Sequence, residues 1–208
     1  MNRVSFKAFC LVLIAICFMS SCCSKAQDNG SNAVIETIMN RKSVRSYTSQ
    51  KVSHDQVMTL LRAAMAAPSG RNMQPWRFVV VDNPDTLKTL ADSLPYAKML
   101  KEASVAIVVC GEMNFVNHRN NDQLEPNKNW TADCAAATEN LLIAVESMGL
   151  GAVWTAAWPY EERYSAVSRT LGIPDGVMPY CVVPIGYPAG ENKPKDKWKP
   201  ENVHFNKW

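Results

Sequence analysis

Residues 131–148 constrain the fold most strongly, because this segment combines length with apolar residues on more than one side. Its sequence is TADCAAATENLLIAVESM, and Gly149, a residue type that often ends helices, follows at once. A helix that is apolar around much of its circumference must be buried on more than one face. We therefore expect 131–148 to form the longest helix, in an arrangement that suits a core shared by two subunits.

Shorter helical and strand patterns surround this segment. They predict helices over residues 33–40, 53–67, 85–93 and 161–171, and strands over 78–81, 105–110, 152–155 and 181–185. Ser53 and Gln56 form a capping-box pattern that opens the second helix, and Pro68 stops it. This order of elements predicts an α+β domain. The polar stretch 112–129 is predicted to be a long irregular loop, a kind of segment that is often functional.

The start of the chain has the features of an export signal. Arg3 and Lys7 precede the apolar run 8–19, which is too short to span a bilayer but has the length of a signal-peptide core. Small residues then lead to Cys22, as they do at lipid-attachment sites, and a cut after Ala26 is the alternative.

We therefore expect a lipoprotein-type signal peptide over residues 1–26 and one domain over 27–208. The protein would be exported to the periplasm, or to the outer membrane or cell surface as a lipoprotein. Its membrane contact would be the lipid on Cys22 alone.

Composition and charge limit the classes of partner. Nearly half of the residues are hydrophobic and a fifth are charged, as in globular proteins. The net charge of +3 falls to +1 without residues 1–21, which gives no basis for nucleic-acid binding. Cys110, Cys134 and Cys181 lie in apolar surroundings and are predicted to be buried free thiols. No spacing of Cys and His predicts a metal site.

The segment NRKSVRSY, residues 40–47, is the first candidate for chemistry. Arg41, Lys42 and Arg45 place three cations around Ser43. Such cations can simply complement the dipole at a helix C-terminus. A guanidinium, an ammonium and a hydroxyl are also the groups that bind a phosphate. The residues by themselves leave both interpretations open.

The segment APSGRNMQPWRFVVV, residues 67–81, sets polar side chains directly before a predicted buried strand. Ser69, Asn72 and Gln74 offer a hydroxyl and two amides, and Gly70 would let a flat ligand approach the backbone. In an extended chain Asn72 and Gln74 would point to the same side. The alternative is a polar loop with internal turns, which uses the same residue types.

Two further segments are weaker candidates. Trp154 is followed by Thr155 and Ala156, small residues that would let a planar group stack on the backbone; the alternative is an ordinary strand end. Lys195 and Lys197 lie in the polar C-terminal segment, where they could bind an anion or simply face solvent.

In their order and spacing these segments resemble the FMN-dependent nitroreductase family over about residues 33–208. The matching motifs are RKSVRSY, APSGRNMQPWRFVVV, ENLLIAVESMGLGAVW, VPIGYP and KPKDKWKPENVHFNKW. The resemblance implies a nitroreductase-like fold with a central mixed β-sheet flanked by helices. It also implies an intertwined homodimer that holds FMN at each of two interfaces.

The resemblance also assigns roles to residues. The phosphate and ribityl end of FMN would contact Arg41, Lys42, Ser43 and Arg45, and Lys195 and Lys197 would close on the same phosphate. The flavin ring or its ribityl chain would be held by Pro68, Ser69, Asn72 and Gln74. Trp154, Thr155 and Ala156 would lie beside the ring.

The implied function is FMN-dependent oxidoreduction. A reduced nicotinamide, NAD(P)H, or another donor would deliver hydride to flavin N5 and leave. A nitroaromatic, a quinone or a similar small electron-poor acceptor would then take the electrons, in a ping-pong cycle. No catalytic side chain and no metal are expected, and residues 112–129 and Trp158 are predicted to shape the acceptor pocket. The alternative function is a non-catalytic exported lipoprotein that uses the same fold to bind flavin or another flat ligand.

Overall fold

The computed structural model describes residues 29–208, so the signal peptide and lipid site predicted within residues 1–26 lie outside it. The described chain divides between Ile38 and Met39 into two units, and each is described by itself. The first contains most of helix α2 (Asn29–Asn40), which begins four residues earlier than predicted. No helix within 29–208 is long and apolar enough to cross a bilayer.

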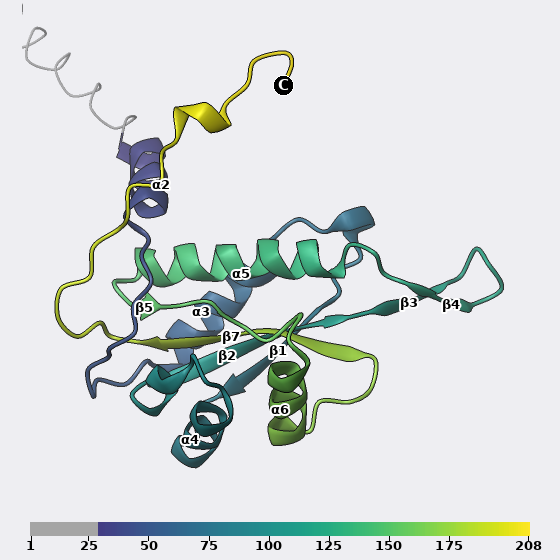
Figure 1. Ribbon diagram of the computed structural model, residues 1–208, viewed down its shortest axis with the longest axis horizontal. Helices are drawn as coiled ribbons and strands as arrows, with labels where there is room; N and C mark the ends of the chain where they lie inside the picture. The colour runs from purple at the N-terminus through teal and green to yellow at the C-terminus, as the bar shows by residue number, and fades with distance from the viewer. Residues whose placement is uncertain (1–28) are drawn as a thin grey trace, which may run out of the picture. The chain divides into compact units, whose positions relative to one another are not determined.

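A five-stranded sheet organises the second unit, Met39–Trp208 (Figure 1). Its strand order is β1 (Trp76–Val81), β2 (Val105–Glu112), β7 (Val177–Gly186) and β5 (Gly151–Ala152), with β6 (Thr155–Ala156) also paired to β7. All of these pairs are antiparallel. Among the described residues, the parallel component expected of a mixed sheet is confined to the bridge between Ser43 and Ala152.

Helices cover both faces of this sheet (Figure 1). The two layers are α3 (His54–Met65) with α5 (Trp130–Ser147) on one face, and α4 (Pro84–Ser93) with α6 (Glu161–Leu171) on the other. Strand β2 shows why: Ile107 and Val109 belong to the α3–α5 core, whereas Ala106 and Val108 belong to the α4–α6 core. Side chains that alternate along a strand thus supply two separate cores.

Local signals place the ends of the helices. Ser53 caps α3 and Gln56 completes the predicted capping box. Asn83 caps α4, with Pro84 at the first helical position, and α6 ends at Gly172 with a φ of 63°. Among residues 29–208, the segment 131–148 is confirmed as the longest helix, α5, with eight buried residues; Ile143 on another side is only half-buried.

Two predicted elements differ from the structure. The stretch 112–129 is not irregular, because β3 (Asn114–Asn117) and β4 (Gln123–Pro126) form a hairpin that projects from the domain (Figure 1). Its turn uses Asn121 and Asp122 at positive φ, which these two residue types tolerate. The strand predicted over 152–155 is divided into β5 and β6. The three thiols predicted to be buried and free are confirmed.

Candidate functional site

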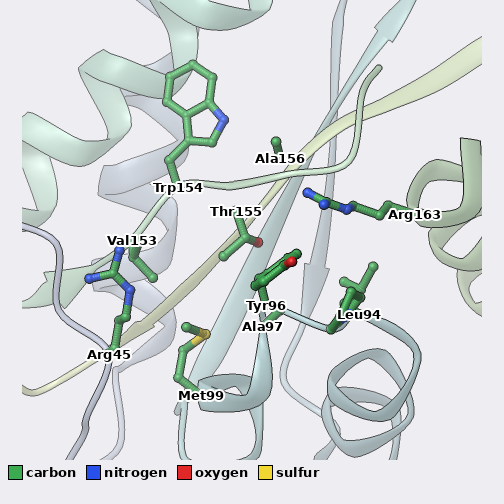
Figure 2. Close-up of a pocket in the computed structure, with 11 residues that line it drawn as sticks. Arg45, Leu94, Tyr96, Ala97, Met99, Val153, Trp154, Thr155, Ala156 and Arg163 are labelled. Atoms are coloured by element: carbon green, nitrogen blue, oxygen red, sulfur yellow. The ribbon is translucent and has the colours of Figure 1, made fainter. Parts of the chain in front are cut away.

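One pocket of about 380 Å³ lies beside strands β5 and β6 (Figure 2). Residues 153–156 form one wall, and residues 94–99, which follow α4, form another. Arg45 and Arg163 complete the lining. The pocket therefore draws on four stretches of chain that are far apart in the sequence.

The wall at residues 153–156 is held by β7. Thr155 pairs with Val182 and Ala156 pairs with Cys181. The hydroxyl of Thr155 donates a 2.6 Å hydrogen bond to the carbonyl of Val182, so its polar group is directed to the strand. Trp154 packs edge-on against Tyr180, with ring centroids 5.5 Å apart. The pocket side of this wall therefore consists largely of small side chains.

Backbone pairing with β5 fixes the segment that carries Arg45. Ser43 forms a parallel bridge with Ala152, and the N–H of Val44 donates a 2.8 Å hydrogen bond to the carbonyl of Ala152. Val44 is buried against Gly151, where a Cβ atom would lie 2.7 Å from the Val44 side chain. Because side chains alternate along an extended chain, Ser43 and Arg45 on either side of Val44 are exposed.

The four residues of the predicted phosphate cluster have different partners. Arg41 Nε lies 3.0 Å from Glu139 Oε1, and Lys42 Nζ lies 2.6 Å from Glu146 Oε1; both glutamates are on α5. Within residues 29–208, Arg45 forms no ion pair. In a single chain Arg45 is thus the cation of this cluster that faces the pocket.

Residues 68–74 form a tight loop rather than the expected extended segment. Asn72 and Gln74 adopt positive φ values of 56° and 50°, and Arg71 adopts 53°. The two amides nevertheless meet: Gln74 Nε2 donates a 2.9 Å hydrogen bond to Asn72 Oδ1, and the Gln74 N–H donates to Ser69 Oγ at 3.0 Å. Three non-glycine residues in this region of φ cost conformational energy, and such strain is typical of functional loops.

Helix α5 anchors this loop through Gly70. The Gly70 N–H donates a 2.8 Å hydrogen bond to Asp133 Oδ1, and a Cβ on Gly70 would lie 2.4 Å from Asn129 Nδ2. The lack of a side chain at Gly70 is therefore explained by the packing of Asn129, and the close approach of a ligand to the Gly70 backbone stays a prediction.

A comparison with models of protein families shows which family the chain belongs to. The model described as "Nitroreductase family" matches residues 38–94 and 92–187. The chain belongs to the nitroreductase family.

Individual relatives agree with this membership. A protein of Archaeoglobus fulgidus, described by its name as an NADH dehydrogenase/NAD(P)H nitroreductase, is 37% identical over 177 residues, covering 84% of this chain and 98% of its own length. A crystal structure of such a protein from Bacteroides thetaiotaomicron is 44% identical with a TM-score of 0.78, over 85% of this chain and 99% of that one. A nitroreductase of Desulfovibrio desulfuricans, solved in complex with FMN, is 26% identical with a TM-score of 0.69, over 88% and 99% of the two chains.

This nitroreductase gathers only part of its predicted site within one subunit. The predicted residues that line the pocket are Arg45, Trp154, Thr155 and Ala156. The predicted residues that do not line it are Arg41, Lys42, Ser43, Pro68, Ser69, Asn72, Gln74, Lys195 and Lys197. In a single chain Ser43, Asn72 and Lys197 therefore do not share this cavity.

The C-terminal segment begins close to the Arg45 segment. Tyr47 pairs with Pro188, and the Ala189 N–H donates a 2.9 Å hydrogen bond to the carbonyl of Ser46. Lys195 and Lys197, farther along, are exposed. Backbone pairing thus joins the segment that carries Arg45 to the start of the C-terminal segment. Lys195 and Lys197, farther along that segment, do not line the pocket.

The residues predicted to shape the acceptor pocket do not line it in a single chain. The lining contains no residue of 112–129. Trp158 instead packs inside the domain, stacked on Tyr164 at 5.7 Å and edge-on to Trp130 at 5.3 Å.

Three residues near the candidate site were not predicted. Arg163 and Tyr96 line the pocket, and both lie in segments without a recognisable motif. Asp133 does not line the pocket but anchors the loop 68–74; in the sequence it resembles an ordinary acidic residue in the first turn of a helix, where it complements the dipole. The only available signal for Arg163 was Tyr160, the aromatic residue at the N-cap of its helix.

Proposed function

We propose that this protein is an FMN-dependent oxidoreductase that uses NAD(P)H to reduce electron-poor acceptors such as nitroaromatics and quinones. Membership of the nitroreductase family, the FMN complex of the Desulfovibrio relative and the nicotinamide in the name of the Archaeoglobus relative support it. The observation that carries the proposal is that Arg45 and residues 154–156, selected separately in the sequence, line one pocket.

The donor set of this region fits FMN. Arg45 faces the pocket without a recorded ion pair among residues 29–208, and Ser43 is exposed beside it, so a guanidinium and a hydroxyl are free for the phosphate. The wall at 154–156 turns the Thr155 hydroxyl away, and it presents the small Thr155 and Ala156 beside Trp154, which leaves room for a flat ring. Lys195 and Lys197 would add charge at the phosphate.

The second half of the site would come from a second copy of the chain. Pro68, Ser69, Asn72 and Gln74 are outside the pocket of their own chain, yet they carry the amides that a heterocycle needs. Trp198 and Phe205 are 71% and 84% exposed, and Ile143 on α5 is only half-buried, so apolar surface remains to be covered. We infer an intertwined homodimer in which each loop 68–74 completes the partner's site.

When bound, FMN accepts a hydride and returns two electrons to an acceptor. The protein binds and orients the reactants. With one further proton, the hydride converts a nitro group to a nitroso group and water, or a quinone to a hydroquinone. Burial raises the pKa of Cys110 to about 12, so this thiol stays protonated and is not a nucleophile at neutral pH.

Purification of the mature protein provides the test. We expect a yellow protein with a flavin absorption spectrum, bleached by NADH or NADPH and restored by a nitroaromatic. Arg45→Gln should weaken FMN binding about tenfold or more, since it removes a charge-assisted hydrogen bond. A colourless protein that takes up no added FMN would exclude the proposal. A flavin-loaded protein that no donor reduces would favour the non-catalytic flavin-binding alternative.

We also propose export, on the sequence of residues 1–26 alone. Cys22→Ser should move the protein from the membrane fraction to the soluble fraction of the cell envelope. Metabolic labelling with a fatty acid should mark the wild type and not the variant. An unmodified mature protein that starts at Gln27 would instead support cleavage after Ala26.

A further inference from the structure

The pocket holds a second guanidinium that the proposed cofactor contacts do not use. Arg163 on α6 and Arg45 approach the pocket from opposite sides in Figure 2, with Thr155 and Tyr96 between them. Among the described residues, the lining contains these two arginines and no carboxylate. If Arg45 serves the phosphate of FMN, no lining residue neutralises the charge of Arg163, whose ion-pair partner Glu162 lies outside the lining.

Aromatic rings hold Arg163 in place. Its guanidinium carbon lies 3.9 Å from the ring centroid of Tyr160 and 5.0 Å from that of Tyr96. The side chain is only 18% exposed. A guanidinium that stacks on aromatic rings keeps its N–H groups at its edge, where they can bind a planar anion.

The hydrogen bonds of Arg163 are incomplete within residues 29–208. Its Nε atom is buried and has no hydrogen-bond partner. Arg163 forms an ion pair with Glu162, whose Oε1 lies 3.6 Å from Nε and thus beyond hydrogen-bond distance; because the Glu162 side chain is 69% exposed, this surface pair is weak. A buried N–H without an acceptor is costly, so an acceptor that reaches the Nε edge of Arg163 would be stabilised there.

We propose that Arg163 binds a carboxylate group of the electron acceptor, so that the enzyme prefers electron-poor aromatic acids to their neutral analogues. This proposal rests on the proposed function, because it places the acceptor in the same pocket as the flavin. A single guanidinium with a free edge matches a carboxylate, which has one charge and two coplanar oxygens. The stacked tyrosines fix the orientation of that edge and lower the entropic cost of binding.

Binding without turnover tests this role directly. Benzoate and benzamide have similar shapes, but only benzoate is charged, and neither contains a nitro group to be reduced. We would titrate each into the FMN-loaded, oxidised protein by calorimetry. The wild type should bind benzoate about tenfold or more tightly than benzamide, because a hydrogen bond to a charged group contributes that much.

Arg163→Gln should remove this preference and leave the dissociation constants for benzamide and FMN unchanged. Arg163→Lys should restore the preference for benzoate in part, because lysine keeps the positive charge but cannot form two parallel hydrogen bonds to a carboxylate. Arg169→Gln is the matched control: Arg169 is on the same helix and exposed, does not line the pocket, and should change nothing. In turnover, Arg163→Gln should raise KM for 4-nitrobenzoate and not for 4-nitrobenzamide.

Three results would overturn the inference. The first is a wild type that does not prefer benzoate, a measurement that stands even if a variant fails to fold. The second is an equal loss of benzoate and benzamide binding in Arg163→Gln. The third is weaker FMN binding in that variant, which would assign Arg163 to the cofactor. A failure of turnover with every acceptor would overturn the proposed function and with it the acceptor preference; the binding titrations would still decide separately whether Arg163 binds a carboxylate.

Discussion

The Gly70 N–H donates a 2.8 Å hydrogen bond to Oδ1 of Asp133, a residue that is only 5% exposed at the start of α5. This bond ties the strained loop 68–74 to the longest helix of the domain. It therefore connects the stability of the core to the position of the two amides in the proposed FMN site.

Asp133→Ala should loosen this loop. The partly buried Gly70 N–H would lose its acceptor, at a cost of about 1–3 kcal/mol in the free energy of unfolding. FMN affinity should fall as well, because Asn72 and Gln74 would no longer be held. Urea unfolding and FMN fluorescence quenching measure the two effects. Asp133→Asn keeps an acceptor oxygen and serves as the control; equal losses in both variants would show that the hydrogen bond is not the cause.

Arg41 was assigned to the phosphate by resemblance, and in a single chain it pairs with Glu139. Arg41→Ala is predicted to weaken FMN binding by about 2–5 kcal/mol, the cost of leaving a buried phosphate charge unpaired. Glu139→Gln removes the competing partner and should leave FMN affinity equal or higher. Equilibrium dialysis of FMN against both variants checks this. If Arg41→Ala binds FMN normally, Arg41 serves the ion pair alone.

Gly151→Ala should destabilise the domain by about 1–3 kcal/mol, because the new methyl group would overlap the Val44 side chain. The same clash would shift the extended segment that carries Ser43 and Arg45, so FMN affinity should also fall. Thermal unfolding of the apoprotein and FMN titration measure the two consequences. Gly149→Ala is the comparison: Gly149 has a φ of 67° and open space around its Cβ position, so only backbone strain of about 1 kcal/mol is expected.

The buried thiols predict a loss of stability at alkaline pH. Burial raises the pKa of Cys110 and of Cys181 to about 12, against about 8.5 for an exposed thiol. Above pH 8.5 the unfolded chain loses these protons and the folded chain keeps them, so stability is complete below that pH and falls as the pH rises towards 12. Each thiol contributes a slope of about 1.4 kcal/mol per pH unit in that window.

Urea midpoints between pH 7 and pH 10 test this dependence. Cys181→Ala should flatten the decline relative to the wild type, even if it lowers stability at neutral pH through the cavity it leaves. An identical alkaline slope in the variant would assign the decline to other groups.

Local sequence signals predicted most of the fold. Ser53 and Gln56 predicted the start of α3, and the Ala-rich run predicted α5. Both predictions succeeded because helix capping and hydrophobic periodicity depend on residues close together in the sequence. The β3–β4 hairpin was missed because its strands alternate weakly: Leu124 is 68% exposed and packs on no core. The pairing of such polar strands depends on their structural context, so no short sequence pattern predicts it.

The candidate site was less predictable than the fold, for a physical reason. Sequence motifs selected Arg45 and Trp154 because of their residue types and positions. They could not show which cations are free of ion pairs, because the glutamates that pair with Arg41 and Lys42 lie about 100 residues away in the sequence. The ion pair of Arg41 with Glu139 and the stacking of Arg163 on Tyr96 are products of tertiary packing. Asn72 and Gln74 were expected to point to the same side of an extended chain; in the structure positive φ angles, and not an extended backbone, bring their side chains together.

The bridge between Tyr47 and Pro188 is the last backbone pairing to the sheet domain before the exposed C-terminal residues. Beyond it, the chain contributes no residue to either large hydrophobic core. A change in residues 190–208 would therefore leave the packing of both cores intact. It would instead alter the cofactor contacts proposed for Lys195 and Lys197 and the apolar surface of Trp198 and Phe205 that a second subunit would cover.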